Sequence, residues 1–304
     1  MDAYKLATSA LWSAVPVTPE REAHGMASIA TSVDGEGRAQ RSERGSLWSS
    51  GSAYEPYVGQ WSRLVAREFL AWLALSPGQR WLDVGCGTGA LSECILRLAA
   101  AREVVGIDPS AAFVAYVREH VTNTGVRFEV GDAQELPYEE GAFDAVVSGL
   151  VLNFVPEPHK GVAEMARVAR SGGTVAAYVW DYAGGMQLMR HFWDTAVALN
   201  PVARAQDEGL RSPLCHPEPL ADLFRGAGVH DVDVRAIHVP THFRDFDDYW
   251  SPFLAGKAPA PDYAMSLDEP RRAALRERIR AGLPVEADGS IRLVARAWAA
   301  RGVR

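Results

Sequence analysis

The sequence predicts an open α/β fold, in which helices cover both faces of a mostly parallel sheet. Two observations predict it. An apolar run at residues 81–84 breaks into a glycine-rich turn at 85–89, and a helix-like stretch follows at 90–98. Further apolar runs recur along the chain, with helix-like segments between them. Strand, glycine turn and helix together form the nucleotide-sized crevice of an open α/β sheet.

Seven apolar or alternating runs are expected to be strands. In chain order they are residues 81–84, 104–107, 126–130, 143–148, 174–180, 232–239 and 291–298. The fifth should follow a turn made by Ser171, Gly172 and Gly173, and the last two should pair antiparallel at one edge. Helices are expected over 61–72, 90–98, 160–168, 186–199, 219–226, 246–253 and 269–283, with another starting near Pro109.

The spacing of the glycine turn indicates which ligand it takes. The glycines follow the pattern G-x-G-x-G rather than the G-x-G-x-x-G of dinucleotide-binding folds. Asp83 stands two residues before Gly85. A carboxylate there would repel a diphosphate but suits a ligand that carries an ammonium group.

A second acidic residue ends the next apolar run. Asp108 lies about 20 residues beyond the turn, where such folds place the carboxylate that binds ribose hydroxyls. The alternative is that Asp108 only caps a helix that starts near Pro109, since Asp followed by Pro is a common helix start. The two roles can coexist.

The stretch from Asp83 to Gly89 reads D-x-G-x-G-x-G and resembles motif I of the class I S-adenosylmethionine (SAM)-dependent methyltransferases. The resemblance covers roughly residues 54–181 and is strongest to the small-molecule group of ubiquinone and menaquinone biosynthesis methyltransferases (methyltransferase domain type 11). It implies a Rossmann-like seven-stranded sheet with an antiparallel edge pair and a helical insert between the last two strands. It also implies SAM as the cofactor and S-adenosylhomocysteine as the product.

The resemblance assigns further residues to the cofactor. Asp132, after the third strand, would accept from the adenine amino group, and the alternative is an ordinary Gly-Asp turn. Tyr54 and Trp61 could lie over the sulfonium, because an aromatic face attracts a cation, or they could simply pack a helix on the sheet. Cys86 is expected to be a small filler in the turn rather than a nucleophile. The full expected cofactor set is Tyr54, Trp61, Asp83, Gly85, Cys86, Gly87, Asp108, Pro109, Asp132, Ala133 and Ser148.

The sequence indicates fewer residues for binding the methyl acceptor than for binding the cofactor. Relatives often have paired histidines where this chain has Asn153, and an amide cannot take up a proton near neutral pH. Asn153, Trp180 and Trp250 are the expected substrate contacts, and no catalytic residue is assigned. Asp181 and His191 are the candidate bases. The alternatives are that Asp181 is an ordinary loop acid and that His191 is a structural or surface residue.

The composition limits which classes of function are expected. The 304 residues carry a net charge of −7, which argues against a broad nucleic-acid surface. Three cysteines show neither disulfide nor zinc spacing, so a reducing cytoplasm is the expected location. No His, Cys, Asp or Glu set has metal-ligand spacing. No membrane span is expected.

The domain organisation follows from a change in composition. Residues 1–52, which include the alternative start Met26, are expected to form a disordered tail. Residues 53–304 are expected to form the methyltransferase domain, with its core at 78–181. Substrate-cap additions are expected at about 186–228 and 244–285.

The sequence therefore predicts methyl transfer from SAM to a small organic acceptor by in-line displacement. Three alternatives stay open: a non-catalytic SAM-binding module, an NAD-type oxidoreductase, and a methyltransferase of protein or nucleic acid. The Asp/Asn-Pro-Pro-aromatic box of enzymes that methylate base amines is absent. The acceptor, the methylated atom and the oligomeric state are left open at this stage.

Overall fold

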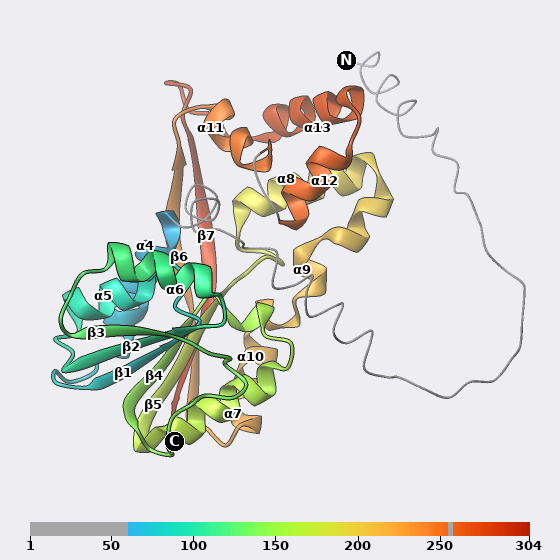
Figure 1. Cartoon of the computed structure of the whole chain (residues 1–304). Coiled ribbons are helices and arrows are strands. Elements are labelled where there is room, and N and C mark those ends of the chain that lie inside the picture. The colour runs from blue at the N-terminus through green and yellow to red at the C-terminus, as the bar shows by residue number, and fades with distance from the viewer. Residues whose placement is uncertain (1–59, 255–257) are drawn as a thin grey trace, which may run out of the picture.

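A seven-stranded sheet organises the protein, which a computed structural model describes over residues 60–254 and 258–304 (Figure 1). The strand order is β3-β2-β1-β4-β5-β7-β6. The strands are β1 (Arg80–Val84), β2 (Glu103–Asp108), β3 (Val126–Val130), β4 (Phe143–Gly149), β5 (Ala169–Trp180), β6 (His230–Phe243) and β7 (Ile291–Val303). The pairs from β3 to β5 are parallel, and β7 runs antiparallel to both β5 and β6. The predicted fold class is confirmed.

Helices cover both faces of the parallel part of the sheet (Figure 1). On one face lie α4 (Gln60–Leu73), α5 (Ala90–Leu98) and α6 (Ala111–His120), and on the other lie α7 (Pro158–Val168) and α10 (Pro217–Gly226). The apolar sides of α4 and α5 pack into one core cluster, and those of α7 and α10 pack into another. Such burial of one apolar side per helix is what holds the layers together.

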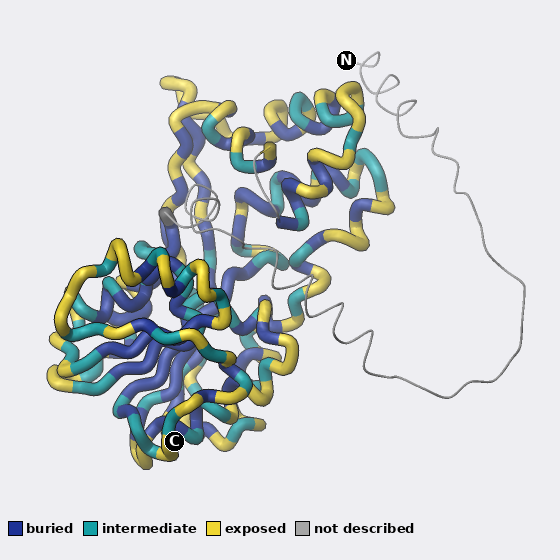
Figure 2. The backbone as a smooth tube through the Cα atoms, in the orientation of Figure 1, coloured by how far each residue is buried: buried dark blue, intermediate teal, exposed yellow. Residues whose placement is uncertain are grey.

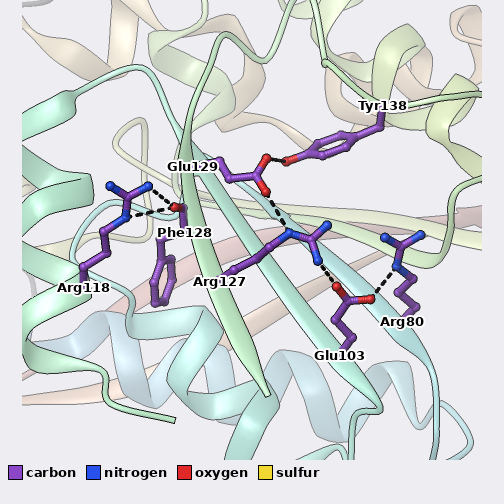
Figure 3. A network of polar contacts seen from close by, with 7 residues as sticks. All are labelled: Arg80, Glu103, Arg118, Arg127, Phe128, Glu129 and Tyr138. Carbon is purple, nitrogen blue, oxygen red and sulfur yellow. Dashed lines mark hydrogen bonds and ion pairs between the residues drawn. The ribbon is translucent and has the colours of Figure 1, made fainter. Parts of the chain in front are cut away.

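The β1–β3 end of the α7 face is covered differently, because residues 131–142 between β3 and β4 contain no helix. A polar network lies there instead (Figure 3). The Arg80 Nε donates to Glu103 at 2.6 Å, and Arg127 pairs with both Glu103 and Glu129. The hydroxyl of Tyr138 donates to Glu129 at 2.8 Å. These pairs tie three neighbouring strands together.

The antiparallel edge strands extend beyond β5 as a two-stranded ribbon (Figure 1). The pairing of β5 with β7 ends at Trp180 and Ala297, whereas β6 and β7 stay paired as far as Phe243 and Ile291. Along this ribbon buried and exposed residues alternate (Figure 2). Helices α8 and α11 pack on its buried side, α12 and α13 pack on α8, and we call this group of four helices the cap.

The cap and its connections contain two longer helices, α8 and α13, and several short ones. They are α8 (Gln187–Leu199), η3 (Pro201–Gln206), α9 (Glu208–Arg211), η4 (Pro213–Cys215), α11 (Phe246–Trp250), η5 (Ser251–Leu254), α12 (Pro259–Ser266) and α13 (Glu269–Gly282). Another short helix, η2 (Leu152–Phe154), follows β4. The sequence prediction missed α9, α12 and the 3-10 turns η2, η3 and η4, because such short segments show little periodicity. No helix in residues 60–254 and 258–304 has the length and apolarity to cross a membrane.

Strands β5, β6 and β7 are longer than expected, and β7 runs on from the expected end at residue 298 to Val303. Ser171, Gly172 and Gly173 lie inside β5 rather than in a turn before it, as an irregularity between its pairings at Ala169 and Thr174. Strand β6 does not end before Pro240, because β6 is the edge strand, where a proline is tolerated. The expected tail, residues 1–52, lies outside the described residues.

Candidate active site

The glycine turn joins β1 to α5 at the carboxyl end of the sheet. Gly85, Gly87 and Gly89 have φ angles of 76°, 51° and 91°, which residues with a Cβ rarely adopt. The amide of Gly85 donates to the carbonyl of Ile107 at 2.7 Å, which holds the turn against β2. A Cβ on Gly85 would lie 2.5 Å from the side chain of Val151, whereas one on Gly87 would meet no atom of the described residues within 4 Å. Gly87 therefore faces open space where a ligand can approach bare backbone.

Asp83 lies beneath this turn and is 1% exposed. Its Oδ2 accepts from the hydroxyl of Ser92 at 2.6 Å, whereas its Oδ1 is buried with no hydrogen-bond partner among the described residues. Burial raises the pKa of Asp83 to about 7, and the charge of Asp108 adds to this effect. A buried carboxyl with an unpaired oxygen is costly without a ligand.

Asp108 ends β2 on the other side of the opening at Gly87. Its Oδ2 accepts from the amide of Gly87 at 3.0 Å and its Oδ1 from the amide of Ser110 at 2.8 Å. Burial raises the pKa of Asp108. The side chain that caps α6 is Ser110, which accepts from the amide of Phe113, so Asp108 is not the cap of that helix.

The other expected cofactor residues lie around the same strand ends. Asp132 is exposed after β3, and its Oδ1 accepts from the amide of Gln134 at 2.9 Å. Ser148 is fully buried on β4 and donates to the carbonyl of Val84 at 2.8 Å, so it ties β4 to β1. Pro109 is exposed after β2, and Ala133 is buried.

Two residues of the expected set are packed in the core. Cys86 is buried against Val114 and Phe128, and burial raises its thiol pKa well above the usual value, as suits a filler rather than a nucleophile. Trp61 on α4 packs edge-to-face against Phe243 with ring centroids 5.5 Å apart. Tyr54 lies outside the described residues.

Asn153 lies on η2 at the carboxyl end of β4, where it meets the end of β5. Its Nδ2 donates to the sulfur of Cys215 at 3.7 Å, and Cys215 in turn donates to the carbonyl of Trp180 at 3.1 Å. The Oδ1 of Asn153 and the Nε1 of Trp180 are buried without partners among the described residues. The structure thus brings Asn153 and the end of β5 together, whereas Trp250 lies within the aromatic core of the cap.

The two candidate bases have different surroundings. The carboxylate of Asp181 is 2% exposed, pairs with the Arg296 guanidinium at 2.5 Å and accepts from the amide of Gly184 at 2.8 Å. These bonds favour a structural role, which holds β7 against the end of β5. His191 lies partly buried on α8, and burial lowers its pKa.

Sequence reasoning missed two polar residues whose partners are buried, one at the glycine turn and one against the cap. Ser92 bonds Asp83 from one turn inside α5, and Glu208 on α9 accepts from the buried indole of Trp193. The serine could have been found from its place on the helix after the glycine turn. Nothing in the sequence pairs Glu208 with Trp193.

Two surface hollows open elsewhere on the sheet. Their volumes are about 540 and 510 Å³, and Val126 and Arg127 line both. The first also takes in Arg80 and Glu103 and lies at the amino ends of the strands, whereas the second runs along the outer side of the edge strand β3, between it and the end of α6. Because open α/β sheets bind their ligands at the carboxyl ends, neither hollow is the expected site. No group of three or more metal-ligating side chains occurs among the residues that the structure describes.

The residues at the carboxyl end fit the chemistry of SAM. The open space at Gly87 lies between two buried acids, Asp83 and Asp108. Neither acid is bonded to an arginine or lysine of the described part of the chain. An ammonium group would compensate Asp83, and ribose hydroxyls can donate to Asp108.

Comparisons with known proteins agree with this site. Residues 82–177 match the methyltransferase domain family. The chain is 28% identical to the demethylmenaquinone methyltransferase of Symbiobacterium thermophilum, over 62% of this chain and 85% of that one. It is 31% identical to an uncharacterised 37.1 kDa transposon protein of Streptomyces fradiae, over 51% of this chain and 49% of that one. The chain spans about half the length of several relatives it matches.

A solved structure shows the same fold. The YcgJ protein of Bacillus subtilis aligns with a TM-score of 0.53 at 16% identity, and the alignment covers 79% of this chain and 98% of that one. The family match begins in β1 and runs through the glycine turn into β5. The chain therefore contains a class I SAM-dependent methyltransferase domain, which binds SAM as its cofactor.

Proposed function

We propose that this protein transfers the methyl group of SAM to a small organic acceptor by in-line displacement. The observation that carries the proposal is the opening at Gly87, next to the buried carboxylates of Asp83 and Asp108, where an added Cβ would meet no atom of residues 60–254 or 258–304. In this arrangement Asp83 would hold the ammonium end and Asp108 the ribose. The name of the relative from Symbiobacterium thermophilum, a demethylmenaquinone methyltransferase, supports a small acceptor.

The chain's contribution to the reaction is alignment and exclusion of water. The methyl group of a sulfonium is already activated, so the protein needs chiefly to hold the acceptor in line with it. The cap and the ribbon stand beyond the carboxyl ends of the strands, on the side where an acceptor would enter (Figure 1). A protein base is needed only where the acceptor loses a proton as it attacks.

The aromatic residues of the cap pack against one another in its core, so we do not assign them to an acceptor pocket. Trp250, Phe253 and Phe192 are at most 4% exposed and contact one another. We therefore place the acceptor nearer the ends of β4 and β5. There the unpaired Oδ1 of Asn153 offers an acceptor for a polar group of the substrate.

Calorimetric titration with SAM, S-adenosylhomocysteine and NAD tests the proposal. We expect binding of the two sulfur ligands and none of NAD. Asp108→Asn should weaken SAM binding by about 1.5–3 kcal/mol, because it removes a charged hydrogen-bond acceptor. The control is Glu103→Gln in the polar network, at the amino end of β2, which should bind SAM as the wild type does.

Turnover is then measured as S-adenosylhomocysteine formed with panels of phenols, hydroquinones and amines. Formation that depends on the acceptor supports the proposal. Tight SAM binding with no turnover on any panel would favour a non-catalytic SAM-binding module instead. NAD binding without SAM binding would contradict the cofactor assignment.

A further inference from the structure

Glu208 lies on α9, close to the carboxyl end of β5. Its neighbour Gly209 is packed so tightly that an added Cβ would lie 2.6 Å from the carbonyl oxygen of Tyr182, two residues beyond the strand. The following turn, η4, reaches both β5 and η2, because Cys215 contacts Trp180 and Asn153. These contacts tie α9, and with it Glu208, to the segment that follows β5, on the side where we place the acceptor.

The carboxyl group of Glu208 is enclosed, and no cation of residues 60–254 or 258–304 is bonded to it. Its Oε2 accepts from Nε1 of Trp193 at 2.5 Å, and Trp193 is fully buried. The nearby guanidinium of Arg190 is taken by Asp207, which it contacts at 2.8 and 2.7 Å, and by Asp194. Glu208 as a residue is not fully buried, since it keeps intermediate exposure at the surface of α9.

Burial is the largest effect on this group and raises the pKa of Glu208 to about 7. The hydrogen bond from Trp193 lowers this pKa, as does the charge of Arg190 on α8, whereas the charge of Asp207 raises it. A carboxyl with a pKa near 7 is a stronger base than an ordinary glutamate and is still largely ionised just above neutral pH.

Other acids near this end of the fold already have partners. Asp181 is paired with Arg296, and Asp194 and Asp207 share Arg190. Asp83 belongs to the cofactor side of the crevice. An enclosed carboxyl without a cation costs free energy, and such groups are common at functional sites.

We propose that Glu208 is the base that takes the proton of a phenolic hydroxyl on the acceptor, so that the product is a methyl ether. This inference rests on the proposed methyltransferase function. The acceptor oxygen gives its proton to the Glu208 carboxylate and keeps the O–H electron pair. That oxygen forms the new bond to the methyl carbon as the carbon–sulfur bond breaks, and the electron pair of that bond stays on sulfur.

A phenol fits this base better than other acceptors do. A phenol has a pKa of about 10, within about 3 units of the Glu208 carboxyl, whereas an ordinary glutamate would lie about 6 units away. A neutral amine can attack without first losing a proton, so it would not need the base.

The decisive variant is Glu208→Gln, which keeps an oxygen for the Trp193 indole but cannot take a proton. With an ordinary phenol we expect kcat/KM to fall by about 10²–10⁴-fold. The loss should shrink for nitrophenols that are already ionised at the assay pH. The control is Asp194→Asn. This variant removes a nearby exposed carboxylate that contacts Arg190, and it should leave turnover unchanged. SAM affinity should stay the same in both variants.

A loss that is equal for all phenols would show that Glu208 only supports the structure, and would overturn the proposal. The pH profile gives a second readout. The wild-type kcat/KM should rise with pH up to about 7, and Glu208→Gln should lack this limb.

A third readout needs no acceptor. The indole N–H signal of Trp193, assigned through Trp193→Phe, should titrate with a midpoint near pH 7 in the wild type and stay constant in Glu208→Gln. A wild-type signal that does not move between about pH 5.5 and 8.5 would refute the base. Methylation of amines, or of hydroquinones at carbon only, would overturn the phenolic acceptor and leave the proposed function standing, whereas failure to bind SAM would contradict the proposed function itself.

Discussion

Binding of SAM to this protein should release protons at neutral pH, and Asp83 should be their source. In the free protein, burial raises the pKa of Asp83 to about 7, so about half of the molecules carry a proton on it at pH 7. SAM would bring positive charge close to the unpaired Oδ1 of this carboxyl. Positive charge favours the ionised form, so the proton leaves as the ligand binds.

The expected amount follows from the size of the pKa change. An opposite charge within hydrogen-bonding range lowers the pKa of a carboxyl by about 1–3 units, so we take a shift from about 7 to about 5. The protein should then release about 0.8 proton per SAM at pH 6, about 0.5 at pH 7 and about 0.1 at pH 8. Release should therefore decrease as the pH rises.

Calorimetry in buffers that differ in ionisation enthalpy measures this number directly. The apparent binding enthalpy should vary linearly with the buffer enthalpy, with a slope equal to the protons released. Asp83→Asn should abolish the slope. Ser92→Ala removes a hydrogen bond that lowers the pKa of Asp83, so the release profile should move to higher pH.

Two results would refute this reasoning. One is a slope near zero at both pH 6 and pH 7 in the wild type, which would mean that Asp83 does not lie near the positive charge of the ligand. The other is an unchanged slope in Asp83→Asn, which would place the released proton on another group.

Three further predictions concern stability and cofactor access. Gly87→Ala should fold but bind SAM weakly in calorimetry, because its Cβ enters the open space. Gly85→Ala should instead lower the melting temperature, because its Cβ would clash with the side chain of Val151. Arg296→Ala should lower the free energy of unfolding by about 3–5 kcal/mol in denaturant titrations, because it leaves a buried carboxylate unpaired. The carboxyls of Asp83 and Glu208 both have folded-state pKa values raised to about 7. Their contribution to stability is therefore greatest at low pH and is lost as the pH rises through 7, and a variant with Asn and Gln at these positions should show a smaller loss of melting temperature between about pH 5 and 8.

Local pattern was sufficient for most of the fold. The predicted runs at 126–130 and 90–98 match β3 and α5 residue for residue, because each is bounded by turn residues and shows one clear period. The cofactor acids could be located in the same way, since the order of strands in this kind of sheet places Asp83 and Asp108 at neighbouring strand ends.

Contacts between distant segments could not be predicted in this way. Asp181 was a candidate base on its position alone, and the structure shows that Arg296, 115 residues later, occupies its carboxylate. Strand β6 continues through Pro240 because it is the edge strand, where a residue without a backbone N–H is tolerated.

The sequence by itself determined the sheet, its helices and the glycine turn with its two acids, because these depend on periodicity and spacing along the chain. Only the tertiary structure decided which acids are free to act. Glu208 and Trp193 are 15 residues apart, on different helices, and only the packing of the cap brings them into contact. The protonation of a carboxyl depends on its burial and its neighbours in space, and residue order does not encode either one directly.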